Sequence, residues 1–195
     1  MKNEGERYDL IAKGFAEMRD SFATEQKYID LFIRHLGDGR KVLDVGCGSG
    51  FPIASYLIKQ GLQVTGVDAS KELLAIAKVK CPDMQQIYGD VRHIAINEKY
   101  DGVIEWWCLF HLPKEDHQRM ISRFAHWLKL DGILEFTTGD REYAASDSNM
   151  LGQELSFYSL NPADYEKYLK KSGFKILLCE SDQEQHLVWI AKKIL

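Results

Sequence analysis

The residues best suited to chemistry in this sequence are three alternating glycines, Gly46, Gly48 and Gly50, which follow a predicted strand at residues 41–45. Glycines between a strand and a helix let the backbone approach a ligand closely and leave amide groups free to bind it. Asp44 adds a carboxylate two residues before the first glycine, and a cationic group of the ligand would explain this acid better than a phosphate would. The loop therefore predicts a site for a nucleotide-like ligand.

The glycine spacing excludes two other nucleotide-binding loops. A P-loop requires a lysine directly after its last glycine, but the nearest lysine here is Lys59, within the next predicted helix. A dinucleotide loop, Gly-x-Gly-x-x-Gly, would need its third glycine where this chain has Phe51 or Ile53. We therefore do not expect a nicotinamide-dependent oxidoreductase.

Strands and helices alternate in the elements that must position this loop. Five β-branched runs, each followed by turn residues, predict parallel strands, and the amphipathic stretches between them predict helices on both faces of one sheet. After Gly173, two strand-like runs on either side of polar residues 181–185 predict a hairpin whose last strand is antiparallel to the others. The seven predicted strands are residues 41–45, 63–67, 84–88, 100–106, 133–138, 174–180 and 186–192.

Helix boundaries also have sequence signals. Ser70 and Asn161 are placed to cap two helices, and Pro52 and Pro113 can open two others. Two amphipathic stretches within residues 1–40 predict a helical cap in front of the sheet. The chain thus has the pattern of a single α/β domain preceded by a short helical segment.

Composition limits the class of partner. The formal net charge of the 195 residues is −4 and neither sign forms a block, so nucleic acid and membranes are not expected as partners. No apolar run exceeds five residues, and the N-terminus has no apolar signal core. Four separate cysteines, with no Cys-x-x-Cys pair, predict free thiols, no metal site and a cytoplasmic location.

From residue 42 to residue 50 the sequence matches, at every position, the first motif of the class I S-adenosylmethionine-dependent methyltransferases, aliphatic-aliphatic-Asp/Glu-aliphatic-Gly-x-Gly-x-Gly. The chain resembles this family over most of its length. Asp68 matches the family's acid that receives two ribose hydroxyls, and Gly89-Asp90 matches its pair near the adenine. The resemblance implies a Rossmann-like, doubly wound, seven-stranded sheet with the last strand antiparallel. It also implies S-adenosyl-L-methionine as cofactor and S-adenosyl-L-homocysteine as product.

The cofactor side of the expected site lies at the ends of the first four strands. A carboxylate at Asp68 suits two neighbouring hydroxyls because it offers two acceptor oxygens. Trp106 and Trp107 depart from the family, and alternation along a strand would send one ring to the core and the other to the pocket, beside the sulfonium. The candidate cofactor-binding residues are Asp44, Gly46, Cys47, Gly48, Gly50, Asp68, Ala69, Gly89, Asp90, Val91 and Trp106.

The acceptor side is expected to lie between the N-terminal cap and residues 139–160, the least regular stretch of the chain. His111 could act as a general base there, or could simply bond to the backbone before Pro113. Phe15 lies where relatives often have tyrosine, so Tyr8 is the remaining candidate for a hydroxyl near the cofactor carboxylate. The candidate acceptor-pocket residues are Tyr8, Phe15, Trp107, Phe110, His111, Tyr143 and Tyr158.

Together these features predict methyl transfer to a small acceptor, with the methylated atom left open. The single domain would consist of the cap at 1–40, a cofactor-binding core at 41–138, an acceptor lid at 139–160, and a C-terminal helix and β-hairpin at 161–195. Two alternatives stay open: a nucleic-acid methyltransferase, although Asn/Asp-Pro-Pro-aromatic is missing after the fourth strand, and a non-catalytic S-adenosylmethionine-binding module. A monomer or homodimer is expected, with a neutral or cationic acceptor.

Overall fold

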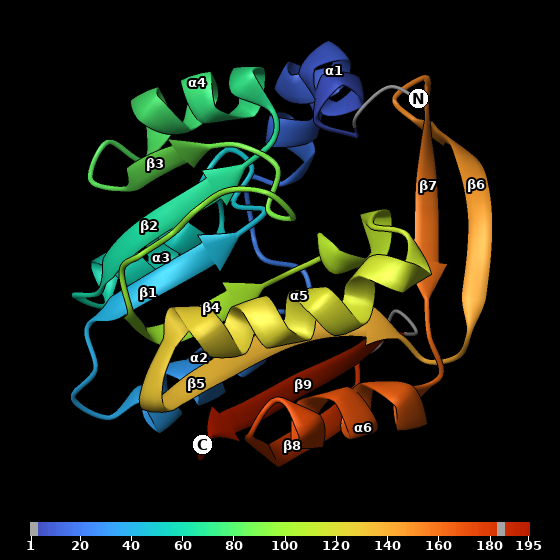
Figure 1. Cartoon of the computed structure of the whole chain (residues 1–195). Helices are drawn as coiled ribbons and strands as arrows, with labels where there is room; N and C mark the ends of the chain where they lie inside the picture. The colour runs from blue at the N-terminus through green and yellow to red at the C-terminus, as the bar shows by residue number, and fades with distance from the viewer. Residues whose placement is uncertain (1–3, 183–185) are drawn as a thin grey trace.

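The alternating apolar runs form a seven-stranded sheet in the computed structural model, which describes residues 4–182 and 186–195 (Figure 1). The strand order is β3-β2-β1-β4-β5-β9-β8. The first five of these strands are parallel, and β9 is antiparallel to both of its neighbours, which confirms the predicted topology. The strands are β1 (Lys41–Val45), β2 (Gln63–Asp68), β3 (Gln85–Tyr88), β4 (Tyr100–Glu105), β5 (Leu128–Gly139), β8 (Phe174–Ser181) and β9 (His186–Lys193).

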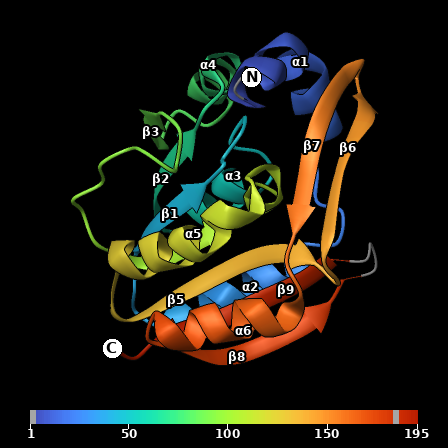
Figure 2. The same ribbon diagram turned by 45° about the vertical axis from the view of Figure 1, so that its right-hand side comes forward.

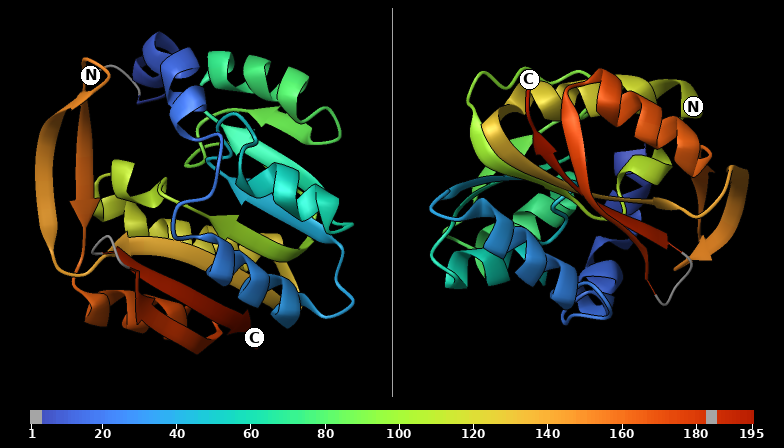
Figure 3. Two further views of the ribbon diagram at one scale, coloured as in Figure 1. Left: turned by 180° about the vertical axis from the view of Figure 1, so that it is seen from behind. Right: turned by 90° about the horizontal axis from the view of Figure 1, so that it is seen from below.

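Helices cover both faces of this sheet. Figure 3 shows α5 and α6 on one face and α2 and α3 on the other. Helix α1 lies above the carboxyl ends of the strands and packs against α4 (Figure 1). The helices are α1 (Glu4–Met18), α2 (Gln26–Leu36), α3 (Ile53–Lys59), α4 (Lys71–Lys80), α5 (Lys114–Trp127) and α6 (Pro162–Lys171), with a short 3-10 helix, η1 (Leu109–His111). No helix in the described part of the chain is long and apolar enough to cross a membrane.

The predicted helix starts have mixed outcomes. Ser70 caps α4 as expected, because its Oγ accepts a hydrogen bond from the amide of Leu73 at 3.1 Å. Pro52 lies one residue before α3 and not at its first position. Asn161 precedes α6 without a side-chain cap, and its side-chain nitrogen donates a hydrogen bond to Glu142. The turn between the last two predicted strands includes residues 183–185, which lie outside the described residues.

The segment expected to be least regular is a β-hairpin. Strands β6 (Tyr143–Met150) and β7 (Gln153–Ser159) pair antiparallel in a sheet of their own, and Figure 2 shows them standing beside α1, away from the main sheet. Leu151 and Gly152 between them have φ angles of 49° and 85°, the two left-handed residues that a tight hairpin turn needs. A leucine in this conformation gives no turn signal in the sequence, so the hairpin was missed.

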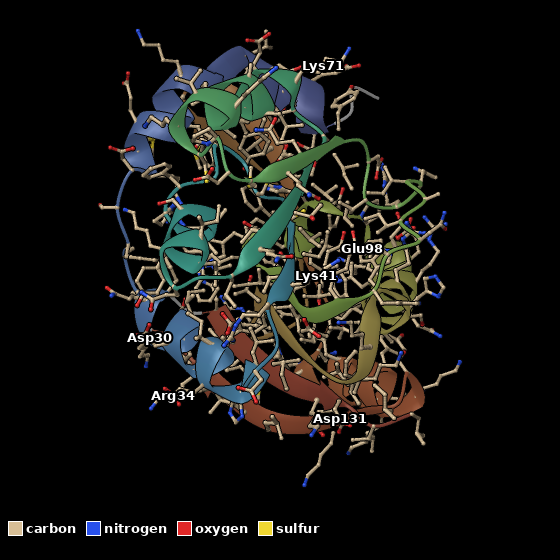
Figure 4. All side chains as sticks on the ribbon, turned by 90° about the vertical axis from the view of Figure 1, so that its left-hand side faces the viewer. Asp30, Arg34, Lys41, Lys71, Glu98 and Asp131 are labelled. Carbon is tan, nitrogen blue, oxygen red and sulfur yellow. The ribbon has the colours of Figure 1, made fainter. Side chains whose placement is uncertain are left out.

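The amino-terminal edge of the sheet is held by charged side chains. Lys41, the first residue of β1, forms an ion pair with Glu98, and Figure 4 shows both at this edge. Asp101 at the start of β4 accepts hydrogen bonds at 2.9 Å from the amides of Arg40 and Lys41, and its other oxygen accepts from Lys129. These contacts fix the strand starts at the end opposite to the glycine loop.

Strand β5 is longer than predicted, because it begins at Leu128 and not at Ile133. Its register against β4 shifts between Tyr100 and Gly102, and Asp131 has a φ of 64°. Aspartate tolerates this left-handed conformation better than most residues do. The residues before Ile133 therefore belong to a continuous strand that contains a bulge.

Glu135 in β5 is the exception to an otherwise apolar interior. It is fully buried, and its register partners are Ile104 and Ile190. Neither carboxyl oxygen has a hydrogen-bond partner among the described residues. Burial raises the pKa of Glu135 well above its usual value of 4.5, because a charge in this layer would lose its hydration without compensation.

We expect the Glu135→Gln variant to lose a pH-dependent part of the folding free energy. A carboxyl whose pKa is higher in the folded protein stabilises the fold at low pH, and this contribution is lost as pH rises through the folded pKa. Between the pKa of Glu135 in the unfolded chain and its higher pKa in the folded protein, the free energy of unfolding of the wild type should fall relative to that of the variant. The fall should be up to about 1.4 kcal/mol per pH unit. Urea unfolding at several pH values measures this difference.

Glu166→Gln, at a half-exposed site on α6, controls for the loss of one negative charge. A difference between wild type and Glu135→Gln that does not change with pH would contradict the buried, protonated carboxyl.

Candidate active site

A cavity of about 510 Å³ opens at the carboxyl ends of β1, β2 and β4, and α1, η1 and β7 close its sides. The strand order reverses between β1 and β4, so the crevice lies where ligands bind in open α/β sheets. Its volume falls within the range of small-molecule sites.

The glycine loop forms one wall of the cavity and is tied to the neighbouring strand. The amides of Gly46 and Cys47 both donate to the carbonyl oxygen of Val67, at 2.8 and 3.1 Å. Gly46 has a φ of 77°, and a Cβ added to it would lie only 2.5 Å from the Cβ of Cys108. The end of β1, the end of β2 and the segment after β4 therefore meet here without room for a side chain.

Asp68 extends this wall with a carboxylate at the end of β2. One oxygen accepts from the amide of Gly48 and the other from the amide of Ser70, both at 2.8 Å. Each carboxylate oxygen can accept more than one hydrogen bond, so both still have capacity for a ligand. This donor set fits a ligand with two adjacent hydroxyl groups.

Asp44 lies buried behind the glycines and also lines the cavity. Burial, with repulsion from Asp68 and Glu105, raises the pKa of Asp44 to about 7. A cationic group of a ligand beside Asp44 would favour its ionised form. The electrostatics therefore agree with the expectation of a positively charged ligand group near this acid.

Glu105, the last residue of β4, is a functional residue that the sequence reasoning missed. It is fully buried and accepts hydrogen bonds from the amides of Cys108, Leu109 and Thr137. Burial raises the pKa of Glu105 to about 7, although the three amides act in the opposite direction. The carboxyl of Glu105 thus connects two parts of the backbone: the turn that leads into η1, and strand β5.

Asp90 faces the cavity after β3, but it is already paired within the protein. Burial raises its pKa, and the hydrogen bonds and charge of Arg92 outweigh this effect, so the net pKa is lowered. The Arg92 guanidinium donates to both carboxylate oxygens at 2.6 to 3.1 Å and contacts Asp116 at 3.3 Å. A ligand amino group at Asp90 would have to share these oxygens with Arg92.

Both tryptophans after β4 line the cavity, so the expectation that strand alternation would separate them is wrong. The strand ends at Glu105, before either residue, and Trp107 has a φ of 62°. The two ring centres lie 6.3 Å apart. Arg19 lies over the Trp107 ring, 4.6 Å from its centre, and pairs with the buried Glu25. A cation from the turn directly after α1 thus already covers this ring.

The opposite wall contains a connected pair of polar side chains. The Tyr8 hydroxyl lies 2.9 Å from Nε2 of His111, and Nδ1 of His111 lies 2.9 Å from the carbonyl oxygen of Ser156 in β7. Burial lowers the pKa of His111 to about 4, so the ring is neutral near pH 7. Three elements, α1, η1 and β7, meet at this pair.

Residues 42–132 match the sequence model of a methyltransferase domain. Over this part of its length the chain is similar to the methyltransferases. A ubiquinone biosynthesis O-methyltransferase of Coxiella burnetii is 33% identical over 147 residues, which cover 69% of this chain and 59% of that relative. The enzyme of the same name from Histophilus somni is 29% identical over 187 residues, covering 86% and 76%. The chain thus spans about three fifths of the first relative's length.

Solved structures share the fold at low sequence identity. A methyltransferase from Clostridium acetobutylicum superposes with a TM-score of 0.73 at 15% identity, covering 96% of this chain and 99% of that one. The CcbJ methyltransferase from Streptomyces caelestis gives a TM-score of 0.77 at 14% identity, covering all of both chains. These likenesses support the Rossmann-like methyltransferase fold.

Most of the predicted site residues meet at the cavity. Three predicted residues do not line the cavity: Gly50, Gly89 and Tyr143. A Cβ added to the two glycines would contact Cys81 and Ile94 respectively, and Tyr143 is 43% exposed on β6. The predicted residues that line the cavity are Asp44, Gly46, Cys47, Gly48, Asp68, Ala69, Asp90, Val91, Trp106, Tyr8, Phe15, Trp107, Phe110, His111 and Tyr158. The chain also places Arg7, Arg19, Arg92, Ser156 and Phe157 there.

We expect Gly46→Ala to destabilise the protein and to weaken binding of S-adenosylhomocysteine. A left-handed alanine costs about 1–2 kcal/mol, and the contact with Cys108 adds about 1–3 kcal/mol. The loop must also move, so the affinity for S-adenosylhomocysteine should fall at least about tenfold, or 1.4 kcal/mol. Thermal unfolding and calorimetric titration measure the two effects.

Gly61→Ala is the matched control. Gly61 has a φ of 84°, but nothing lies within 4 Å of an added Cβ. This variant should show the conformational cost alone and bind S-adenosylhomocysteine as the wild type does. Equal behaviour of the two variants would mean that the close approach of Cys108 has no consequence for the site.

Proposed function

We propose that this protein transfers a methyl group from S-adenosylmethionine to a small-molecule acceptor. The observation that carries the proposal is the meeting of the glycine loop and the two-oxygen acceptor of Asp68 on one side of a single cavity. On the other side lie aromatic groups and a neutral histidine. The similarity to methyltransferases and the two-sided cavity together favour an enzyme over a binding module.

The cofactor side fits the proposed ligand through its donor set. Asp68 would accept hydrogen bonds from the two ribose hydroxyls, and the glycine loop leaves room for the methionine part to pass. Asp44 would lie near the positively charged end of the ligand, which lowers the cost of its own ionisation. The cofactor supplies a methyl group on a positively charged sulfur, which leaves as a neutral thioether.

The protein's own contribution would be positioning and exclusion of water. The end of β4 and η1 hold the acceptor wall at a fixed place, because Glu105 anchors their backbone. A fixed approach geometry can supply most of the acceleration of a simple displacement. His111 has a pKa of about 4, and each of its ring nitrogens already takes part in a hydrogen bond within the protein. We therefore propose that it orients neighbouring groups and does not act as the base.

The names of the relatives indicate which class of acceptor to test first. They are named ubiquinone biosynthesis O-methyltransferases, so we propose oxygen acceptors before amines, thiols and carboxylic acids. Net charge favours a neutral or cationic molecule over nucleic acid. A cytoplasmic location and a monomeric or homodimeric state are part of the same proposal.

A methyl-transfer screen over small phenols, alcohols, amines, thiols and carboxylic acids tests the activity, with S-adenosylhomocysteine release as the readout. Calorimetry on the same protein should give binding of S-adenosylmethionine and none of NADH. Turnover with any member of the screen supports the proposal. Cofactor binding without turnover in a broad screen would favour the non-catalytic module instead.

We expect Asp68→Asn to reduce the affinity for S-adenosylhomocysteine at least about tenfold, or 1.4 kcal/mol, while the protein stays folded. The asparagine NH2 group would face the amides of Gly48 or Ser70, and it would remove one acceptor for the ribose hydroxyls. Isothermal titration measures the affinity, and circular dichroism checks the fold.

The same exchange at Asp83, an exposed residue in the turn before β3, is the control and should leave the affinity unchanged. Full affinity in Asp68→Asn would mean that the cofactor's ribose does not lie at the end of β2.

A further inference from the structure

The hydrogen bonds between Tyr8, His111 and Ser156 have a fixed direction. The Ser156 carbonyl oxygen can only accept, so Nδ1 of His111 carries a hydrogen. His111 is only 9% exposed, and this burial keeps the ring neutral, with one N–H group. Nε2 therefore has a free lone pair, and the Tyr8 hydroxyl donates its hydrogen to it over 2.9 Å.

This direction determines what Tyr8 can offer to a ligand. A phenolic hydroxyl has one hydrogen, and here it is directed to His111. Tyr8 lines the cavity, and its oxygen then has only lone pairs left to offer. A ligand that contacts this oxygen must supply an O–H or N–H group. Tyr8 in this arrangement cannot donate to a cofactor carboxylate, the role considered for it from the sequence.

Aromatic rings surround this acceptor oxygen. The ring centre of Tyr8 lies 5.0 Å from that of Phe15 and 5.5 Å from that of His111. His111 in turn lies 4.7 Å from Phe110 and 5.0 Å from Phe157, and these last two are 5.4 Å apart. All five residues line the cavity, so the wall continues from α1 across η1 to β7. Flat aromatic molecules pack well against such a surface.

The charges of the cavity wall favour an uncharged ligand at this place. Its three arginines already donate to protein oxygens: Arg7 to the carbonyl of Glu154, Arg19 to Glu25, and Arg92 to Asp90. A carboxylate ligand would therefore have to share each of these cations with an existing partner. An uncharged ring with one polar hydrogen makes no such demand.

We propose that the Tyr8 oxygen determines acceptor specificity by accepting a hydrogen bond from the hydroxyl or amino group of an uncharged aromatic acceptor, held between α1, η1 and β7. The inference rests on the proposed methyl transfer. O-methylation removes the hydrogen that Tyr8 requires, so the site prefers the acceptor to its methylated product. Tyr8 is thus a positioning residue that distinguishes a phenol from its methyl ether.

Three probes separate the ring from the hydrogen bond. Phenol has both features, anisole has the ring without the O–H group, and cyclohexanol has the O–H group without the aromatic ring. Ligand-observed NMR titrations on protein saturated with S-adenosylhomocysteine give the three affinities. For the wild type we expect phenol to bind about tenfold more tightly than anisole, the size of one hydrogen bond, and several-fold more tightly than cyclohexanol.

Two variants test the two features separately. Tyr8→Phe should reduce the phenol-to-anisole ratio to about one and leave the affinity for S-adenosylhomocysteine within about twofold of the wild type. Phe157→Leu should reduce the preference for phenol over cyclohexanol and keep the preference over anisole. The control is Tyr143→Phe, which removes a hydroxyl from the same hairpin as Phe157 but outside the cavity, and it should change neither ratio.

Three results would overturn the proposal: a wild type with no preference for phenol over anisole, a Tyr8→Phe variant that keeps this preference, or cyclohexanol bound as tightly as phenol. A wild-type protein that fails to bind S-adenosylhomocysteine would instead overturn the proposed function. The cofactor titration comes first, so the two failures are distinguished.

Discussion

The buried carboxyl of Glu105 is the contact on which the two-sided site depends. Its oxygens accept three backbone hydrogen bonds, two from the turn after β4 and one from Thr137 in β5. Without a carboxyl at this position, those amides would be buried without partners, at about 1–3 kcal/mol each. The turn carries Trp107, Phe110 and His111 into the cavity, so the acceptor wall is held at a fixed distance from the end of the sheet.

The cofactor wall has a similar origin in neighbouring strand ends. The carbonyl of Val67 at the end of β2 accepts the amides of the glycine loop at the end of β1, and Asp68 accepts one more. The loop conformation is thus fixed by the parallel pairing of β1 and β2. Asp68 and Glu105 lie close enough to Asp44 to raise its pKa, and the cavity floor is therefore suited to a ligand that brings positive charge.

Much of this arrangement could be predicted from the sequence, because its signals are local. The glycine spacing, the strand-end acids and the Ser70 cap each depend on residues close together in the chain. The contribution of Glu105 depends on Thr137, which is 32 positions away. Its only sequence signal was an acid at the end of an apolar strand. The hairpin of β6 and β7 was missed for a different reason, since Leu151 adopts a turn conformation that leucine rarely has.

The two elements outside the common sheet carry the acceptor side. Helix α1 provides Tyr8 and Phe15, and β7 provides Ser156 and Phe157, while the sheet contributes only the fixed turn after β4. Because Ser156 presents a carbonyl oxygen to His111, the hairpin backbone sets the protonated nitrogen of the ring and, through it, the direction of the Tyr8 hydroxyl. Any backbone position in β7 can present a carbonyl whatever its side chain. The register of the hairpin therefore determines the direction of the hydrogen bonds in this part of the pocket. Sequence changes in β7 that preserve the register can alter the shape of the pocket without altering this direction.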